Sequence, residues 1–583
     1  MKHNRILPLI GIIAAGFLGL LSLARGWAPA QGAKPDPALV GFWPLRDDAK
    51  DASGHGLDGQ IRGVGFTFDS LGGGPRSAQF PGRGAWIEVP DSKELDLGTG
   101  DFSIAVWVRT PARLADTIGD ILSKFDPRTR CGINLSIMQS GGACTSMANT
   151  RNLFFGIDAG RISPWRDCGR PGRAILVFGL AVYDSDLYAA TYEGGADEAG
   201  HVYRYRGGQD WEDCGSPDLC NSVTSLAVHD GRLFAGTARY NATGSHLTAS
   251  PNVHDGGRVF RYEGGRRWVD CGKVGLTECT WGLMDYDGVL YASLMDSPNV
   301  QNRPGQGLYA YRGGTTWEYC GNPGGRVAAL SAHDRHLYAS GYDGGELGGV
   351  FRYDGGQKWT DFGPPPWVTQ TYSYAVSGGE LLVGTWPDGT VFKCLGPRQW
   401  INAGRLGEEK EVMGMAVYNG KLYGGTLPLA QIYRRDGDSA WTLTGRLDMT
   451  PGVEYRRAWS MAVFEGKLFC GVLPSGHVWS LEAGKAVTWD RALAPEWRHI
   501  AAVKDRGLLK LYVDGVKVAG STEFAPAEFN LANDAPLKIG FGEHDYFKGG
   551  LRNLYLFGRA LSDVEVMKMY RTGIDGSPVR RAR

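Results

Sequence analysis

The 583-residue sequence has no excess of charge of either sign, with 62 Lys and Arg residues against 62 Asp and Glu residues. It also has no long basic run, which argues against nucleic acid or an anionic membrane as the main partner. No Cys-x-x-Cys pair and no Cys/His quartet at zinc-finger spacing occurs, which argues against a structural zinc site of that kind. No Ser/His/Asp signature or phosphate-binding loop stands out, so the motifs indicate no particular reaction.

Long apolar runs are absent except at the N-terminus, where residues 6–24 follow the basic residues Lys2 and Arg5. A small-residue motif at 28–30 completes the pattern of a signal peptide over residues 1–30. The apolar run is also just long enough to span a bilayer as an uncleaved signal anchor. In either case we expect the rest of the chain to be secreted, periplasmic or at the cell surface.

Glycine is abundant, at 87 residues, without the three-residue period of collagen. Apolar residues make up 43% of the chain and aromatic residues 11%, which excludes wholesale disorder. A long chain with many aromatic residues and many glycine-bearing turns predicts a large all-β protein.

A four-strand pattern recurs over residues 164–489 and predicts a β-propeller. The turns between its first and second strands carry Asp230-Gly231, Asp287-Gly288 and Asn419-Gly420, which suit type I′ hairpins. Alternation with period two, in units of about four dozen residues, is typical of propeller blades rather than helical repeats. We expect seven blades, since the second strand begins seven times, at Leu187, Leu233, Leu290, Leu337, Leu381, Leu422 and Leu468.

A tryptophan marks the fourth strand of each repeat. The sequence contains eight such tryptophans, one more than the seven expected blades. We expect these side chains to pack between blades rather than to contact a ligand, and the extra strand to be available for closing the ring. The residues are Trp165, Trp211, Trp268, Trp317, Trp359, Trp400, Trp441 and Trp489.

The segments on either side of the repeat carry several separate motifs, among them "DFSIAVWVRT" at 101–110 and "EWRHIAAVKDRGLLKLYVDGVKVAG" at 496–520. Together they resemble the laminin-G-like, concanavalin A-type jelly-roll family. The resemblance implies one sandwich built from 38–163 and 490–573, interrupted by a propeller at 164–489. A linker at 31–37 and a basic tail at 574–583 complete this division.

The family usually binds glycans or proteins, often with calcium, and the resemblance carries that expectation to this chain. In "DASGHGLDG", Asp51 and Asp58 offer oxygen ligands for a hard cation. Where the family usually has an acidic pair, this chain has Arg552 and Asn553, which weakens the expectation. The alternative is that both aspartates are turn residues, and no other cofactor is expected.

Two hairpins of the repeat, at 354–359 and 436–441, resemble the Asp box of sialidase propellers. Kelch-type propellers are a comparably loose resemblance. Both imply a fold and no activity, since the arginine trio and the nucleophilic tyrosine of sialidases have no identifiable counterparts here.

The sequence contains ten cysteines, and an exported protein forms disulfides readily. Cys214–Cys220 and Cys271–Cys279 occupy matching places in two repeats, so we expect each pair to brace a loop. Cys131–Cys144 is a third candidate pair. The alternative is a set of free, buried thiols.

On one face of the propeller lie the loops between second and third strands and the segments that lead into first strands. We call it the loop face and expect a ligand to bind there. Aromatic rings there would stack on sugar rings while charged groups bind hydroxyls, although ordinary loop packing is the alternative. The opposite, short-turn face, which carries His229 and His333, is predicted to have no functional role. The candidate residues are Tyr192, Arg239, Tyr240, Trp281, Asp296, Tyr342, Asp343, Trp386, Asp388, Arg457 and Trp459.

These patterns favour a non-enzymatic protein that binds an extracellular glycan or protein. The alternative is a carbohydrate-active enzyme, glycosidase- or lyase-like, that uses Asp296, Asp343 and Asp388 on successive blades. A glycosidase needs two carboxyl groups about 5–10 Å apart, which the sequence does not reveal. We expect no nucleic acid partner, and membrane contact only through an uncleaved signal anchor.

Overall fold

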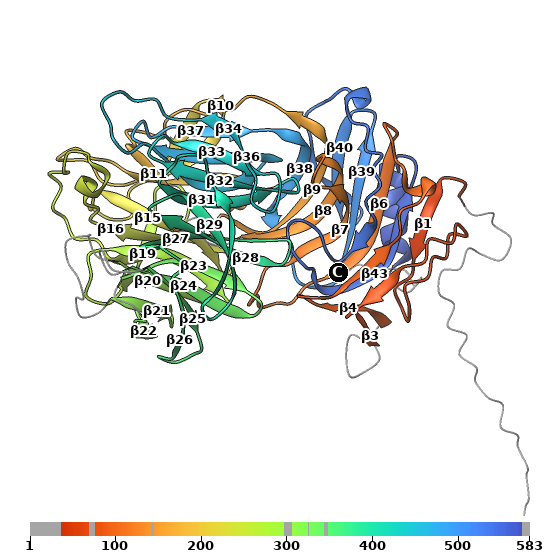
Figure 1. Cartoon of the computed structure of the whole chain (residues 1–583), viewed down its shortest axis with the longest axis horizontal. Helices are drawn as coiled ribbons and strands as arrows, with labels where there is room; N and C mark the ends of the chain where they lie inside the picture. The colour runs from red at the N-terminus through yellow and green to blue at the C-terminus, as the bar shows by residue number, and fades with distance from the viewer. Residues whose placement is uncertain are drawn as a thin grey trace, which may run out of the picture.

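The computed structural model describes residues 36–68, 76–140, 145–295, 306–323, 326–342 and 348–573. These residues form two all-β parts that lie side by side, a pair of large sheets and a propeller-like ring of smaller sheets (Figure 1). The predicted all-β class is confirmed. The predicted signal segment and basic tail lie outside the described residues.

Two large sheets form the sandwich. The first sheet has the order β3-β4-β43-β6-β39-β40-β41, with β1 paired to β43, and the second has the order β2-β5-β42-β7-β8-β9-β38. The strands of the first sheet are β1 (Leu39–Trp43), β3 (Gly65–Phe68), β4 (Arg76–Pro81), β6 (Phe102–Arg109), β39 (Arg498–Asp505), β40 (Leu508–Val513), β41 (Val516–Gly520) and β43 (Lys548–Phe557). Those of the second are β2 (Gln60–Arg62), β5 (Trp86–Val89), β7 (Gly119–Asp126), β8 (Cys131–Ser140), β9 (Asn149–Ile162), β38 (Ala483–Ala492) and β42 (Leu537–Ile539).

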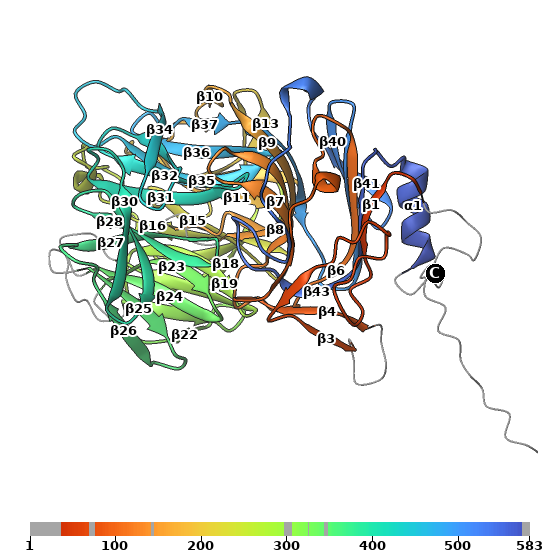
Figure 2. The ribbon, with the colours of Figure 1, turned by 45° about the vertical axis from the view of Figure 1, so that its right-hand side comes forward.

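Strand alternation explains how the sandwich is filled. In β6, Phe102, Ile104 and Val106 enter the core between the two sheets, whereas Ala105 faces the opposite side. This is the period-two pattern of a strand with two different faces. The outer face of the first sheet is covered by α1 (Asp563–Thr572), which begins with a capping box of Ser562 and Glu565 (Figure 2).

The second sheet lies between the first sheet and the propeller (Figures 1 and 2), and the middle of β9 is buried on both faces. Leu153 and Phe155 of β9 belong to the sandwich core, while Phe154 packs against Tyr418 of the propeller with 6.3 Å between ring centroids. Segments far apart in the sequence meet here, because β9 pairs with β38 and β6 pairs with β39.

Three short 3-10 helices, η1 (Lys93–Leu95), η2 (Ala242–Ser245) and η3 (Pro526–Glu528), complete the described helical elements. Within the described ranges, no helix has the length and hydropathy needed to cross a membrane.

Five separate four-stranded sheets form blades of the propeller. They have the orders β19-β20-β21-β22, β23-β24-β25-β26, β27-β28-β29-β30, β31-β32-β33-β34 and β10-β37-β36-β35. Their strands are β10 (Arg166–Asp167), β19 (Thr280–Tyr286), β20 (Val289–Leu294), β21 (Gly307–Tyr311), β22 (Trp317–Tyr319), β23 (Arg326–His333), β24 (His336–Tyr342), β25 (Gly349–Tyr353), β26 (Trp359–Gly363), β27 (Gln370–Ser377), β28 (Glu380–Trp386), β29 (Thr390–Gly396), β30 (Gln399–Arg405), β31 (Glu411–Tyr418), β32 (Lys421–Leu427), β33 (Gln431–Arg435), β34 (Trp441–Arg446), β35 (Arg457–Phe464), β36 (Lys467–Leu473) and β37 (Val478–Leu481).

The remaining propeller strands form one eight-stranded sheet rather than separate blades. A single residue pair, Tyr192 with Ser222, joins its two four-stranded portions. Its strands are β11 (Leu176–Tyr183), β12 (Asp186–Tyr192), β13 (Val202–Gly207), β14 (Asp210–Asp213), β15 (Ser222–His229), β16 (Arg232–Ala238), β17 (Arg258–Tyr262) and β18 (Trp268–Lys273).

The ring closes at both its inner and outer edges. Inner strand β35 contacts inner strand β11, and the short strand β10 pairs with β37, which comes from the other end of the repeat. The predicted turn chemistry is confirmed, since Asp230 and Gly231 have φ of 46° and 67°, and Asn419 and Gly420 have φ of 45° and 77°.

A recurring hydrogen bond joins neighbouring blades through the repeated tryptophans. The indole N–H of Trp268 donates to the carbonyl of Cys214 at 2.9 Å, and Trp317 donates to Cys271 at the same distance. The acceptor is the third residue after the preceding tryptophan, in the motif Trp-x-x-Cys-Gly. Equivalent bonds run from Trp211 to Cys168, Trp359 to Cys320 and Trp441 to Ala403.

Three tryptophans depart from this pattern. Trp165 Nε1 donates to the Thr444 hydroxyl at 3.4 Å rather than to a carbonyl. Within the described residues Trp400 Nε1 has no hydrogen-bond partner, because the equivalent carbonyl, that of Phe362, accepts from Arg398 N instead. Trp489 was predicted to be a propeller residue, which is wrong. It lies in β38 opposite Leu153 of β9 and packs against the sandwich core.

The predicted Cys214–Cys220 and Cys271–Cys279 disulfides are not formed, and the described residues contain no disulfide. Cys214 and Cys271 fill the same buried position of the Trp-x-x-Cys-Gly motif, which Phe362 and Ala403 occupy in other blades. The position therefore requires an apolar side chain and no partner sulfur. Cys144 lies outside the described residues.

We predict that Trp268→Phe lowers the free energy of unfolding more than Trp400→Phe does. Both changes remove a similar part of the ring, but only the first removes a made hydrogen bond, worth about 0.5–1.5 kcal/mol. Urea denaturation of both variants measures the difference, and equal losses would show that the indole bond contributes nothing.

Candidate functional site

The short-turn face of the propeller docks on the sandwich. Asn419 Nδ2 donates to the carbonyls of Ile157 and Ala483 at 3.0 and 2.9 Å. The backbone N–H of Gly378 donates to Glu543 O at 3.0 Å. Residues of the hairpin turns therefore also form the interface between the propeller and the sandwich.

A segment of the sandwich, residues 145–149, runs among the inner strands of the ring and is called here the channel segment. Met147 N donates to Leu226 O at 2.9 Å, while Asn149 exchanges two bonds with the backbone of Val463 at 2.8 and 3.0 Å. Further bonds join Thr145 to Phe178, Thr224 and Leu283, and Ala148 to Val182.

An aromatic cluster lies on the loop-face side of the channel segment. Phe178 is at its centre, with ring centroids 5.0 Å from Tyr240, 5.6 Å from Trp281 and 5.3 Å from Trp459. These rings come from different blades, so the structure does bring several of the predicted residues together. Tyr192, Trp386, Tyr372 and Tyr455 belong to the same apolar cluster.

Burial separates the predicted residues into two groups. Tyr192, Trp281 and Trp459 are at most 2% exposed, and Arg457 is 9% exposed, with its guanidinium 5.1 Å from the Trp459 ring. These side chains form a core that a ligand does not reach in this conformation. Tyr240 and Trp386 are half-buried and Arg239 is exposed.

The exposed part of the cluster is a rim of aromatic and charged side chains. The Lys410 ammonium lies 6.0 Å from the Trp386 ring and 5.5 Å from the Tyr455 ring. The ring of His246 contacts Tyr455 at 4.8 Å between centroids, and its Nδ1 lies 2.6 Å from Glu454. These five residues are called here the loop-face rim.

Other predicted residues are engaged with neighbours. Trp367, 60% exposed, donates its indole N–H to Asp388 at 3.0 Å, and Arg239 forms an ion pair with Glu278 at 3.5 Å. Asp296 and Asp343 lie outside the described residues, as does the side chain of Tyr342.

A buried carboxyl group that the sequence did not single out lies below the rim. Glu411 is 5% exposed, and burial raises its pKa to about 7 although the Arg457 charge opposes this shift. Its Oε1 has no hydrogen-bond partner within the described residues. Such a carboxyl is protonated in a substantial fraction of molecules near neutral pH.

The predicted calcium ligands stabilise a turn. Asp51 accepts from the N–H groups of Phe42, Ser53 and Leu57 at 2.9–3.1 Å, and Asp58 accepts from Asp51 N at 2.9 Å. Burial acts to raise the pKa of Asp51, but these hydrogen bonds outweigh it and lower the pKa. Calcium binding at this turn stays a prediction.

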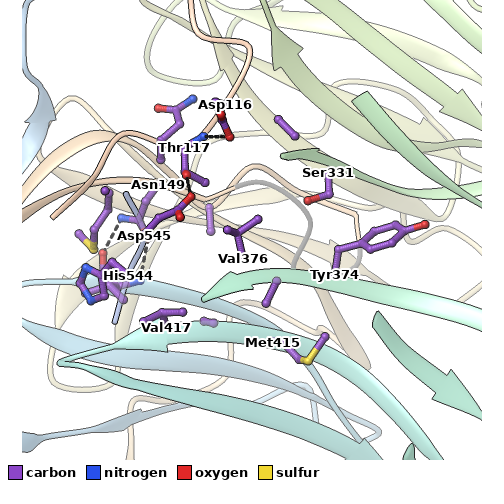
Figure 3. A pocket seen from close by; sticks show the side chains of 18 of the residues that line it. Asp116, Thr117, Asn149, Ser331, Tyr374, Val376, Met415, Val417, His544 and Asp545 are labelled. Carbon is purple, nitrogen blue, oxygen red and sulfur yellow. Dashed lines mark hydrogen bonds between the residues drawn. The ribbon is translucent and has the colours of Figure 1, made fainter. Parts of the chain in front are cut away.

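A cavity of about 70 Å³ lies between the channel segment and the inner strands, near the sandwich (Figure 3). It has room for a few water molecules or an ion rather than for a sugar ring. Asp116, Thr117 and Asp545 line it from the sandwich, and Ser331 and Tyr374 from the propeller.

A cluster of buried acid and imidazole groups lies beside this cavity. Asp116, His333 and Asp545 each offer a metal-ligating atom within 4.8 Å of those of the other two. Burial, together with the nearby charge of Asp116, raises the pKa of Asp545 to about 7, and burial also raises that of Asp116. Burial and the charge of Arg83 lower the pKa of His333 to about 4, so its imidazole is neutral at pH 7.

Sequence reasoning missed this cluster because its members are more than 200 residues apart and belong to no shared motif. Only docking of the propeller turn on two sandwich loops brings them together. Lys410 and Glu411 of the other site carry a weak signal in the sequence. They lie at the start of β31, the first strand of its blade, and some predicted binding residues of other blades occupy the same place.

Comparisons with known proteins support one part of the fold. Residues 439–567 match a family described as the concanavalin A-like lectin/glucanases superfamily. The match spans β38–β43 of the sandwich and also strands of the propeller. A concanavalin A-like domain is thereby supported. No curated protein matches the sequence.

Solved structures with a similar arrangement are distant. Virginiamycin B lyase from Staphylococcus aureus is 9% identical, with a TM-score of 0.40, over 55% of this chain and 99% of that one. The gluconolactonase XC5397 from Xanthomonas campestris is 13% identical, with a TM-score of 0.29, over 64% and 99%. The extracellular domain of BT4673 from B. thetaiotaomicron is 12% identical, with a TM-score of 0.38, over 62% and 47%. Likeness at this level assigns no activity to this chain.

We predict that Trp459→Ala lowers the free energy of unfolding by about 3–5 kcal/mol, because it leaves a cavity in the buried aromatic cluster. Trp367→Ala, at an exposed position of the same face, is expected to cost less than about 1 kcal/mol. Thermal and urea denaturation of the two variants check this. A small loss at Trp459 would mean that the cluster is open to solvent.

Proposed function

We propose that this protein is an extracellular binding protein that recognises a glycan through the loop-face rim. The observation that carries this proposal is the placement of Lys410 against two aromatic rings, Trp386 and Tyr455, at an exposed edge. A ring face and adjacent charged groups are the elements with which proteins hold a sugar. The pair of His246 with Glu454 adds further hydrogen-bonding groups.

The buried aromatic cluster supports this role from beneath. Trp281, Trp459 and Phe178 fill the space under the rim and hold its backbone in place. A binding surface on a rigid support loses less conformational entropy when the ligand binds. The concanavalin A-like match is consistent with a binding protein but does not choose the ligand.

The same proposal includes the architecture expected from the sequence. We propose that the eight-stranded sheet is two blades, β11–β14 and β15–β18, which gives a ring of seven. Seven inner strands in mutual contact, from β11 to β35 and back, support this count. We further propose that the ring is inserted into the sandwich, supported by the pairing of β9 with β38 and of β6 with β39.

We also propose that the N-terminal segment directs export of the chain. The segment is then either cleaved as a signal peptide or kept as a membrane anchor. An extracellular protein is an alternative ligand to a glycan at the same rim.

We predict that Trp386→Ala weakens the affinity for a glycan identified on an array by roughly three- to tenfold. This is the loss expected from removing one stacking contact of about 0.5–1.5 kcal/mol. Isothermal titration calorimetry of the full chain measures it. Tyr319→Ala, which removes a 38% exposed ring from the outer strand β22, is the matched control.

If Trp386→Ala and the control both bind the glycan as the wild type does, the loop-face rim is not the binding site. The sandwich would then be the next candidate. If no glycan on the array binds, the same variant pair is tested against extracellular proteins.

The second candidate function is a carbohydrate-active enzyme, favoured by the buried Glu411. A carboxyl group with a pKa near 7 is suited to act as a general acid, as in glycosidases. Its burial beneath Arg457 and the rim means that a substrate would have to open the cluster to reach it.

If the chain is a hydrolase or lyase, we predict that its activity falls as the pH rises through about 7. The reason is that Glu411, with its pKa raised to about 7, loses its proton above that pH. Glu411→Gln should lower kcat at least a hundredfold, while the 94% exposed Glu408→Gln leaves kcat unchanged. A panel of polysaccharide substrates supplies the assay, and equal activity of both variants would exclude Glu411.

A further inference from the structure

We propose that Asp116, His333 and Asp545 bind one divalent metal ion of the zinc class at the junction between the sandwich and the propeller. The three groups come from separate elements. Asp116 lies between β6 and β7, Asp545 lies between β42 and β43, and His333 is the last residue of β23. All three are buried, and their ligating atoms lie within 4.8 Å of one another.

This spacing fits a shared ion. Zinc binds nitrogen and carboxylate oxygen at about 2.0–2.2 Å, so two of its ligands are at most about 4.4 Å apart. Three ligating atoms within 4.8 Å of one another are therefore close to the spacing that a shared ion requires. The set shares no residue with the turn of Asp51 and Asp58, and it needs residues from both parts of the molecule.

His333 is the second, independent observation. Its side chain is 7% exposed, and its Nδ1 has no hydrogen-bond partner within the described residues. A buried imidazole nitrogen without a partner is costly, and a metal ion would satisfy it. His229 ends the equivalent strand of another blade, and there Nδ1 lies 2.6 Å from Asp285 Oδ2.

The two carboxylates are held in place by neighbours. Asp116 Oδ1 accepts from Thr117 N and Asp334 N at 3.0 Å each, and these bonds leave Oδ2 available. Asp545 accepts from Tyr546 N at 2.7 Å and from the Thr117 hydroxyl. Hydrogen bonds of this kind orient metal ligands in known sites.

Two cationic side chains, Arg83 and Lys548, lie near the cluster and weaken its attraction for a cation. Arg83 is paired with Asp334 at 3.2 Å, and Lys548 interacts with Asp116. Lys548 therefore offsets part of the negative charge of the two buried carboxylates but cannot bond to the imidazole nitrogen as a metal ion does.

The ligand types select the ion. One imidazole and two carboxylates suit zinc and manganese, whereas calcium takes six to eight oxygen ligands. Three protein ligands leave one coordination position for water. Asp116 and Asp545 also line the cavity of Figure 3, which has room for that water.

A metal ion at this place would cross-link the two parts of the fold, because two ligands belong to sandwich loops and the third to the end of propeller strand β23. An ion that binds only the docked, native state raises the stability of that state by mass action. The site would thus strengthen the same interface that the channel segment forms.

The test uses the full chain after dialysis against a chelator, titrated with ZnCl₂ in a calorimeter and, in parallel, with CaCl₂. We expect saturable binding of one Zn²⁺ per chain, no comparable binding of Ca²⁺, and a higher Tm with zinc than without. His333→Gln should weaken zinc binding at least tenfold and abolish the rise in Tm. The matched control His229→Gln should bind zinc as the wild type does.

Equal zinc affinity in His333→Gln and the wild type would overturn the proposal, as would the absence of saturable binding to the wild type. If His333→Gln does not fold, Asp545→Asn replaces it with the same expectations. A further test, which needs no variant, is the absorption spectrum of the wild type loaded with Co²⁺. This spectrum should lack a thiolate charge-transfer band, and such a band would assign the metal to cysteines instead.

Discussion

The hydrogen bonds between the channel segment and the inner strands are the constraint on which the arrangement of this molecule depends. Residues 145–148 precede β9 of the sandwich and Asn149 begins it, yet this segment bonds to four inner strands of the ring. Backbone groups buried there need partners, and the sandwich supplies them. Gly179 makes room for this contact, because a Cβ at that position would clash with Ser146. The two parts are therefore positioned relative to each other by specific bonds as well as by apolar packing.

A second set of bonds holds the ring itself together. Each Trp-x-x-Cys-Gly motif supplies a donor to one neighbour and an acceptor to the other, so that blade follows blade in a fixed register. The glycine after the acceptor takes positive φ, as Gly215 does at 88°, and its N–H is bonded to the Asp213 side chain. Where alanine replaces the cysteine, at Ala403, the bond from Trp441 persists, since the acceptor is a backbone carbonyl. Where phenylalanine replaces it, at Phe362, the carbonyl accepts from Arg398 N instead.

The two faces of the ring differ in what they offer a partner. The loop face carries rings and charges that reach solvent above a buried aromatic cluster. The short-turn face is covered by the sandwich and holds polar groups that water does not reach freely, which is where burial shifts pKa values most. The binding role and the metal site are thus separate proposals on opposite sides of the channel segment.

The sequence by itself determined the all-β class, the repeat and its turns, because period-two alternation and Asp-Gly or Asn-Gly pairs act over a few residues. It also predicted that aromatic residues of successive blades would gather on one face, and Tyr240, Trp281 and Trp459 do so. Tertiary structure alone decided that Trp281 and Trp459 are buried, that Trp489 belongs to the sandwich, and that Cys214 and Cys271 need no partner. It alone brought Asp116, His333 and Asp545 together, because their proximity arises from the docking of two folded parts and leaves no local trace in the chain.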